Sequence, residues 1–505
     1  MKYDVIIVGA GSAGACMASR LSEKSNLSIM LLEEGKDFAI SEEFPDVIKY
    51  EYGPLRLNNP YVKAYPSTIN SSQSETKFMY RGNIVGGSSS INGAFFLRGL
   101  PEDFDGWAIK GNHEWSFLRV LSYFRRLELD SKYAGDFHGI EGPMPVRRQS
   151  IDDLSEGHQR FLKACKSAGF VYSADMNHPE ADGVGLLPIN DLDGFRINTA
   201  VAYLNPVRNR MNLTIRTQVS VRRILFEQDR AIGVDVESMG DRFQLYANEI
   251  VLCAGAIGSP VLLLQSGVGP ISSLNSLGIP VVQDLKGVGS NLRNHPMISV
   301  RYRNAKIELH DSLIKPLFLR YTANGSNTPR DMTIEPDFDI LADDISYSSL
   351  AVRLELPKSS GRLKLTSSDL HVLPSLEFNI MDPWDLERLR EGVRMAISIA
   401  EQDEFAGMFE YRVTPNDDHI KSDTSMDDWL LSNLSVAQHT SGTCMMGPSS
   451  NPMSVVNQYG YVHGVTGLRI ADASIMPNIV RANPHVTTIM IAEKISDWIK
   501  NGIGE

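Results

Sequence analysis

The chain has 505 residues, and at about 150 residues per domain this length predicts roughly three structural units. Hydrophobic residues make up 42% and charged residues 22% of the chain, which excludes disorder, collagen and a coiled coil as descriptions of the whole. The net charge is -12, so the basic surface that nucleic-acid-binding proteins use is missing and we expect no nucleic-acid partner.

The first predicted element is a strand that runs into a glycine-rich turn and a helix. Residues 4–14 read DVIIVGAGSAG, a continuous apolar run typical of a buried parallel strand, ending in the pattern GxGxxG. In such a turn Gly9 permits the tight bend, Gly11 lets the backbone approach a pyrophosphate, and Gly14 lets the helix pack closely on the strand. An ordinary strand-to-helix turn is the alternative interpretation.

A second apolar strand, at residues 27–32, completes a βαβ unit. It ends at Glu33, the position from which a carboxylate binds an adenosine ribose. This context favours a dinucleotide site over an ordinary turn. Both FAD and NAD are held in this way, so the unit alone does not distinguish them.

Small residues dominate the next informative segment, residues 81–108, which reads RGNIVGGSSSINGAFFLRGLPEDFDGWA. Its glycines and serines expose many backbone amides, and such a loop suits contact with a flat, polar-edged ring system. Two more motif-like segments follow, GAIGSPVLLLQSGVGP at residues 255–270 and GVGSNLRNHP at residues 287–296.

The pattern then changes to that of an amphipathic sheet. Residues 349–356 alternate apolar and polar side chains, and residues 362–365 are predicted as the partner strand. Asp382 and Pro383 predict the start of a helix that covers this sheet. Two polar loops, residues 70–76 and 322–330, are predicted either as solvated loops or as lids.

Two histidines stand out near the end of the chain. His439 lies in QHTSGTCMMG and His485 lies in ANPHVTTIMIAEK. An imidazole has an ordinary pKa of about 6.5 and therefore suits removal of a hydroxyl proton. Apolar residues recur at helical spacing after Pro484, so we predict a helix whose positive N-terminal end points toward the bound cofactor.

Together these segments resemble the signatures of the glucose–methanol–choline (GMC) family of FAD-dependent oxidoreductases. The resembling segments are residues 81–108, 255–270, 287–296, 438–447 and 471–499. The resemblance implies FAD instead of NAD, and an α/β fold class with two interleaved domains. One is a discontinuous Rossmann-like FAD-binding domain, and the other is an α+β substrate domain built on an antiparallel sheet backed by helices.

The resemblance also implies domain boundaries and cofactor contacts. The FAD-binding domain is expected over residues 1–155, 206–300 and 455–505, and the substrate domain over residues 156–205 and 301–454. The FAD diphosphate is expected at the three glycines of the first turn and the ribose at Glu33. The remaining predicted cofactor contacts are Gly86, Gly87, Ser88, Asn92, Gly93, Val221, Asp472 and Val486.

Several of these positions have alternative interpretations. Val221 is otherwise simply a strand residue, and Asp472 is otherwise a helix N-cap. Ile91 stands where some family members carry a histidine bonded to the flavin, so we predict non-covalent FAD. His295 follows Asn294, where family members often carry an aspartate, and we predict a structural role for it.

The predicted reaction is the oxidation of a primary or secondary alcohol to an aldehyde or ketone. The resemblance implies that His439 is the main base for the hydroxyl proton, while the hydride goes to the flavin. His485 is expected to orient the alkoxide, and a share in the base role is the alternative for it. The electron acceptor is either O2 or another redox carrier; residues 91–117 and 142–148 resemble the branch associated with mycofactocin clusters, which implies a carrier. The alternative is a lyase like hydroxynitrile lyase or another non-oxidase use of the flavin, because the same fold also hosts a lyase and a light-driven decarboxylase.

Cysteine usage and the start of the chain bear on location. The four cysteines are too few and too scattered for a disulfide scaffold or a CxxC metal site. The chain begins without an apolar leader, and its longest nearly uncharged stretch, residues 250–264, is too short and too broken to span a bilayer. We therefore expect a cytoplasmic protein with no metal site and no membrane span.

Overall fold

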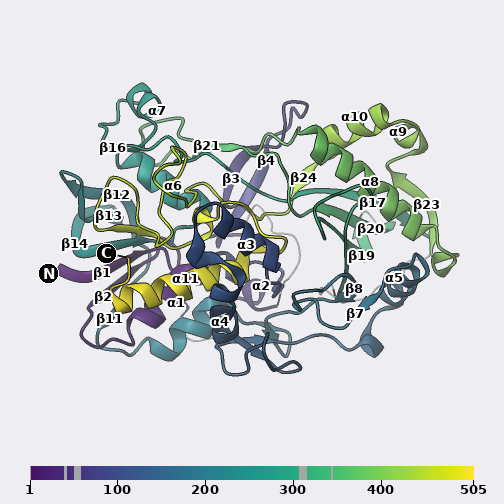
Figure 1. Ribbon diagram of the computed structural model, residues 1–505, viewed down its shortest axis with the longest axis horizontal. Coiled ribbons are helices and arrows are strands. Elements are labelled where there is room, and N and C mark those ends of the chain that lie inside the picture. The colour runs from purple at the N-terminus through teal and green to yellow at the C-terminus, as the bar shows by residue number, and fades with distance from the viewer. Residues whose placement is uncertain (1, 39–42, 51–58, 306–315, 343–344, 505) are drawn as a thin grey trace.

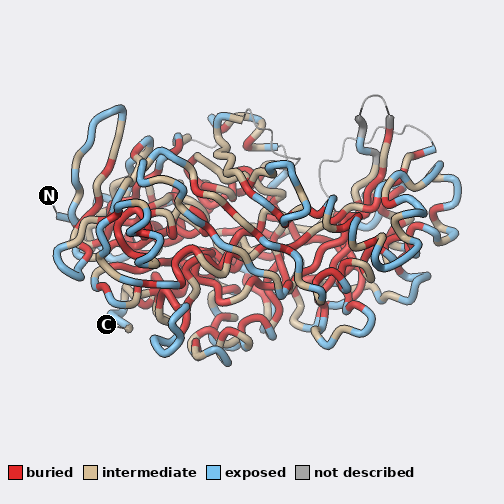
Figure 2. Tube along the Cα trace, turned by 90° about the horizontal axis from the view of Figure 1, so that it is seen from above, coloured by how far each residue is buried: buried red, intermediate tan, exposed pale blue. Residues whose placement is uncertain are grey.

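The computed structural model describes residues 2–38, 43–50, 59–305, 316–342 and 345–504. Two large sheets lie at opposite ends of the molecule, and the two chain termini lie together beside one of them (Figure 1). The buried part of the chain trace runs through both ends, while exposed segments lie at the outer turns (Figure 2). Among the described residues, no helix is both long and apolar enough to cross a membrane.

The sheet beside the termini has seven strands in the order β11-β2-β1-β14-β13-β12, with β25 also paired to β14. Strands β1, β2, β11, β14 and β25 are parallel, whereas β12 and β13 are antiparallel additions. Their bounds are β1 (Lys2–Val8), β2 (Ile29–Leu32), β11 (Leu213–Arg216), β12 (Ser220–Glu227), β13 (Arg230–Ser238), β14 (Asp241–Leu252) and β25 (Leu468–Ile470).

Register explains why the predicted cofactor segments meet. Val8 at the end of β1 is paired with Leu32 of β2 and with Leu252 of β14, and Leu252 is paired with Ile470 of β25. The residues that follow these strands therefore emerge at one edge of the sheet, the usual ligand-binding edge of parallel sheets. Three helices flank this sheet: α1 (Ser12–Leu21) and α11 (Pro484–Asn501), which pack side by side, and α6 (Gly255–Gln265), which packs on β12.

The other large sheet has eight strands in the order β23-β17-β20-β19-β18-β8-β7, with β24 paired to β17. All pairings are antiparallel except that of β7 with β8. The bounds are β7 (Tyr172–Ser173), β8 (Gly183–Leu186), β17 (Pro296–Asn304), β18 (Leu317–Tyr321), β19 (Met332–Ala342), β20 (Ile345–Leu354), β23 (Phe409–Thr414) and β24 (Ser435–Val436).

Helices back the eight-stranded sheet. The helix α8 (Pro383–Ala400) packs on β17, β19 and β20, and it begins as predicted, because the Asp382 carboxylate accepts the backbone N–H of Trp384. The helix α5 (Glu156–Ser167) packs on β8, β18 and β19, and α10 (Asp423–Asn433) packs on α8. The α/β fold class and the helix-backed antiparallel sheet are thus confirmed, while the exact domain boundaries stay a prediction.

One predicted pairing is wrong. The strand β21 (Arg362–Lys364) does not pair with β20; it belongs to a four-stranded sheet with β22 (Ser375–Glu377), β3 (Val62–Thr68) and β4 (Lys77–Gly82). Gly361 makes this possible, because a Cβ there would lie 1.8 Å from the Glu377 carbonyl oxygen. A period-two pattern does not identify the partner strand, so the sequence could not specify this pairing.

The two polar loops are tied to their surroundings. Asn70 donates its side-chain amide to the carbonyl of Leu431, and the Arg330 guanidinium donates to the Pro179 carbonyl oxygen at 2.6 Å. The remaining elements are α2 (Asp46–Lys49), α3 (Pro101–Ile109), α4 (Phe117–Leu127), α7 (Ile271–Ser276), α9 (Asp417–Ile420), β5 (Glu128–Asp130), β6 (Met144–Val146), β9 (Asp191–Leu192), β10 (Phe195–Arg196), β15 (Val268–Gly269) and β16 (Gln283–Asp284).

Candidate active site

A cavity of about 860 Å³ lies where the predicted cofactor segments converge. Its wall combines the turn after β1, the end of β2, the glycine- and serine-rich loop after β4, β12, the start of α6 and residues from the eight-stranded sheet. The predicted site residues that line it are Gly9, Gly11, Glu33, Gly87, Ser88, Asn92, Gly93, Val221, His439, Asp472 and His485.

The glycines of the first turn make a tight backbone cradle. Gly9 has a φ of +97°, and a Cβ there would lie 2.7 Å from the Cys253 carbonyl oxygen. A Cβ on Gly14 would lie 1.8 Å from the Gly9 carbonyl oxygen, so the turn closes only with glycine at that position. Gly11 is the N-cap of α1 and supplies no capping side chain, which leaves the first amides of this helix available to an anion.

The loop after β4 packs directly on this turn. Gly87 has a φ of +54°, and a Cβ there would lie 2.7 Å from the Gly11 Cα atom. A short 3₁₀ helix over Gly87–Ser90 then carries Ser88 along the cavity wall. The backbone surface formed by Gly11 and Gly87 fits the flat, phosphate-bearing FAD that the resemblance implies.

Glu33 lies at the end of β2, where its carboxylate accepts the backbone N–H groups of Ala10 at 2.8 Å and Gly35 at 2.9 Å. Burial raises the pKa of Glu33 to about 7, although these two hydrogen bonds oppose the shift. The side chain therefore braces the turn as well as lining the cavity.

Asp472 has the N-cap geometry that was the alternative interpretation. Its carboxylate accepts the backbone N–H of Ser474 at 2.8 Å, the backbone N–H of Gly255 at 2.9 Å and the Ser259 hydroxyl at 2.6 Å. It joins the segment after β25 to the start of α6, and it also lines the cavity. Its predicted contact with FAD stays a prediction.

Three predicted cofactor residues are not among the lining residues: Gly14, Gly86 and Val486. Gly14 faces the turn carbonyl described above, and Val486, in the first turn of α11, is fully buried. Gly86 has a φ of +92° and turns the chain into the 3₁₀ helix. These residues shape the wall from behind, and their sequence motifs did not distinguish that role from direct contact.

His439 lies at the end of the cavity that faces the eight-stranded sheet. Its Nε2 atom is 3.0 Å from the side-chain amide nitrogen of Asn483, and its Nδ1 atom is 2.8 Å from Nδ1 of His295. Burial, the neighbouring His295 and the positive charges of Arg353 and Arg81 hold the pKa of His439 well below its ordinary value. The imidazole is therefore neutral near pH 7 and can accept a proton.

His485 lies in the first turn of α11 and lines the same cavity. Its Nδ1 atom is 3.1 Å from the Ser12 hydroxyl, and its Nε2 atom has no partner among the residues that the structure describes. Burial lowers the pKa of His485 to about 4, so this imidazole is neutral too.

Two residues beside His439 received no catalytic assignment from the sequence. Asn483, two positions before His485, contacts the His439 ring, and its position in the Asn-Pro-His segment was the available signal. His295 also contacts the ring, and the structural role predicted for it stays a prediction. Asn294 stands where family members often carry an aspartate. Its side-chain oxygen accepts the backbone N–H groups of His439 at 2.9 Å and His295 at 3.0 Å.

A chain of buried charges extends behind this histidine pair. His295 Nε2 lies 3.5 Å from Glu355 Oε2, and Glu355 is ion-paired with Arg353 at 2.5 Å. Arg353 also pairs with Glu335 at 2.6 Å, and both of these side chains line the cavity. Burial opposes ionisation of Glu355, but the charge of Arg353 and the hydrogen bonds from Arg353 and Thr333 lower its pKa to about 2.

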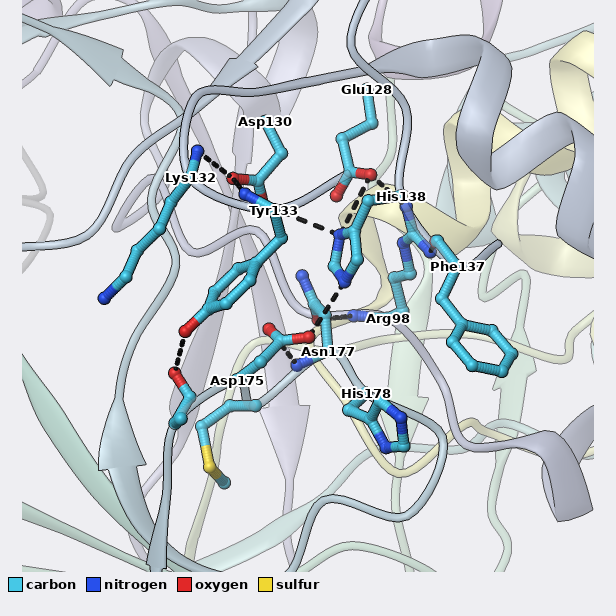
Figure 3. Close-up of polar contacts among 12 residues, drawn as sticks. Arg98, Glu128, Asp130, Lys132, Tyr133, Phe137, His138, Asp175, Asn177 and His178 are labelled. Atoms are coloured by element: carbon cyan, nitrogen blue, oxygen red, sulfur yellow. Dashed lines mark hydrogen bonds and ion pairs between the residues drawn. The ribbon is translucent and has the colours of Figure 1, made fainter. Parts of the chain in front are cut away.

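A second group of buried polar side chains lies apart from the cavity, around β5 (Figure 3). Ligand-type atoms of Glu128, Asp130 and His138 all lie within 4.8 Å of one another, as metal ligands do. The Arg98 guanidinium, however, pairs with Glu128, and the Arg148 guanidinium pairs with Asp130 at 2.8 Å.

His138 supplies the remaining positive charge of this group. Its Nε2 atom lies 2.8 Å from Asp175, and its Nδ1 atom lies 3.3 Å from Glu128. Burial opposes protonation, but the bonds to Asp175 and Glu128 raise the pKa of His138 to about 9. Two guanidiniums and an imidazolium balance three carboxylates, so we assign the group to an ion network of the fold and not to a metal.

Comparisons with known proteins agree with this geometry. Residues 3–297 and 357–492 match the N-terminal and C-terminal family models described as GMC oxidoreductase. The chain is 34% identical to a GMC-type oxidoreductase of Rhodococcus erythropolis, covering 98% of this chain and 97% of the relative. It is 35% identical to oxygen-dependent choline dehydrogenase 1 of Chromohalobacter salexigens, with 99% and 95% covered. The solved structure of pyridoxine 4-oxidase from Mesorbium loti superposes with a TM-score of 0.92 at 28% identity, covering 99% of each chain.

Proposed function

The chain belongs to the GMC oxidoreductase family, and from that premise we propose that it oxidises a primary or secondary alcohol to an aldehyde or ketone with His439 as the base. The family matches establish that the protein is an FAD-dependent oxidoreductase acting on CH–OH donors. The role of His439 as the base is supported by its place in the cavity wall and by a pKa well below the ordinary value, which leaves the imidazole neutral.

The residues present fit FAD. The backbone of Gly9, Gly11 and Gly87 forms a cradle that a Cβ would fill, and Glu33 lies at the end of β2 beside it. When bound, FAD accepts the hydride that leaves the alcohol carbon. Ile91, which lines the cavity, offers no nucleophile, and we propose that FAD is held without a covalent bond.

Side chains of the protein take the hydroxyl proton of the alcohol and orient its oxygen. The O–H bond breaks and the proton passes to Nε2 of His439, a general-base step worth about 10²–10⁴-fold in rate. The Asn483 side-chain amide donates to this same Nε2 at 3.0 Å, so the substrate hydroxyl replaces that amide as the hydrogen-bond donor. His485, with Ser12 at its Nδ1, is the group that we assign to donate a hydrogen bond to the alkoxide oxygen. The positive end of α11 favours negative charge at this end of the cavity.

The substrate is proposed only as a class. Relatives are named for choline and for pyridoxine, so these alcohols belong in a first substrate panel with simple aliphatic and aromatic alcohols. The electron acceptor is O2 or another redox carrier, and this choice stays a prediction.

Anaerobic mixing of the purified holoenzyme with this panel tests the proposal. We expect the flavin absorbance to bleach with at least one alcohol, together with formation of the matching aldehyde or ketone. Absence of bleaching with every alcohol in the panel would count against alcohol oxidation and favour a lyase-type use of the fold.

A further inference from the structure

The contact between His295 and His439 determines how protons are arranged at the active site. The two Nδ1 atoms are 2.8 Å apart, and the rings meet edge to face at 81°. One of these nitrogens must carry a proton and the other must accept it, because two lone pairs or two protons at that distance would repel.

The environment of His295 decides which nitrogen donates. His295 is fully buried, and its Nε2 atom lies 3.0 Å from the Val480 carbonyl oxygen and 3.5 Å from Glu355 Oε2. Both neighbours are acceptors, so Nε2 of His295 carries a proton. Burial holds the pKa of His295 below its ordinary value, so the ring is neutral and its Nδ1 has a free lone pair.

His439 must then donate from Nδ1. A neutral imidazole with its proton on Nδ1 has its lone pair on Nε2, and Nε2 is the atom that accepts the Asn483 amide at 3.0 Å. The hydrogen-bond chain thus runs in one direction, from Asn483 through His439 and His295 to the Val480 carbonyl. The lone pair of His439 therefore lies on Nε2, where the substrate hydroxyl replaces the Asn483 amide as the hydrogen-bond donor.

We infer that His295 is a positioning residue that holds His439 in the tautomer able to remove the substrate proton. This inference rests on the proposed role of His439. His295 also stabilises the product of that step, because the His439 imidazolium keeps its Nδ1–H bond to His295 while the Glu355 carboxylate lies behind His295. Without the acceptor at Nδ1, His439 can place its proton on Nε2, where it blocks the reaction.

The test compares two substitutions of His295. His295→Asn keeps a side-chain oxygen that can accept from His439 Nδ1, whereas His295→Leu removes every acceptor. We expect His295→Leu to lower the flavin-reduction rate by about 10–100-fold with little change in KM or FAD content, and His295→Asn to restore most of the rate. His463→Leu is the matched control, since His463 Nε2 donates to the Gly447 carbonyl oxygen at 3.0 Å and His463 does not line the cavity.

A second readout does not require turnover. In holoenzyme labelled with ¹⁵N-histidine, Nε2 of His439 is expected to show the shift of an unprotonated nitrogen, assigned by its loss in His439→Gln. A protonated Nε2 in the native enzyme, or a His295→Leu rate within about threefold of native, would overturn the inference. Equal loss of rate in His295→Leu and His295→Asn at matched FAD content would overturn it as well. If no alcohol reduces the native enzyme, the proposed function fails while the nitrogen shift still tests the tautomer.

Discussion

Two buried histidines in this protein are in different protonation states: His138 is protonated and His439 is neutral. His138, in the ion network around β5, lies at hydrogen-bond distance from Asp175 and close to Glu128, and its pKa is raised to about 9 (Figure 3). His439, in the cavity wall, contacts His295 and Asn483, and its pKa is held well below the ordinary value. Burial opposes the charged form at both sites, so the carboxylates within reach decide the outcome.

The comparison separates a structural histidine from a candidate base. A protonated His138 completes a balanced set of charges and has no lone pair left to accept a proton. His439 has its nearest positive charges, Arg353 and Arg81, placed so that they disfavour protonation. A base needs that state at rest, and it gains a charge only during the reaction.

The largest expected effect is the loss of flavin reduction when the neutral histidine, His439, is replaced. His439→Ala should lower the rate of flavin reduction by about 10³-fold, about 4 kcal/mol in activation free energy, because it removes the imidazole to which we assign the hydroxyl proton. Stopped-flow absorbance under anaerobic conditions measures this rate. FAD content should stay unchanged, and His113→Ala, at an exposed position, serves as the control. A variant that kept more than about a tenth of the native rate would contradict the base role.

Removing a charge from the ion network around β5 should lower the free energy of unfolding instead of the reaction rate. Arg148→Met leaves Asp130 and Asp175 without their guanidinium partner, and losing one member of a buried ion pair costs about 3–5 kcal/mol in the free energy of unfolding. Chemical denaturation of the holoenzyme measures this cost. Arg362→Met is the matched control, because its pair with Glu377 is exposed and worth about 0–1 kcal/mol. Equal effects of the two substitutions would show that the network around β5 is not a balanced unit.

A smaller effect should appear as alkaline destabilisation. The pKa of His138 is about 9 in the folded protein and about 6.5 in the unfolded chain, so the folded state binds the proton more tightly. The resulting stability is complete below pH 6.5 and is lost as the pH rises through 9. The melting temperature of the native protein should therefore fall between pH 7 and 10, and His138→Gln should flatten that decline. An unchanged decline in the variant would refute the assigned charge.

The sequence predicted the parts of the two sites that depend on local patterns. The turn at Gly9 and Gly14 and the helices that begin at Pro383 and Pro484 each follow from short motifs with a steric reason, and His439 came from a motif of the family. Local patterns of this kind carry over into three dimensions because neighbours in the chain stay neighbours in space.

The partners of both histidines could not be predicted in this way. His295 and His439 are 144 residues apart and meet because Pro296 of β17 is paired with Val436 of β24. Nothing in either segment specifies that register, since period-two patterns fit many pairings. The network around His138 likewise draws on segments from Arg98 to Asp175 that share no motif.

The smallest expected effect is that kcat/KM depends very little on pH near neutrality. This pH profile tests whether His439 differs electrostatically from His138. Because the pKa of His439 lies well below 6.5, the base is already unprotonated at pH 6.5, and kcat/KM should change less than about twofold between pH 6.5 and 8.5. The rate should fall only on the acid side, as His439 gains a proton. Stopped-flow or steady-state profiles in constant ionic strength measure this. A tenfold rise of kcat/KM across that range would mean that the base titrates near neutrality, as a histidine with a carboxylate partner would, and that the electrostatic difference between His439 and His138 is smaller than their contacts indicate.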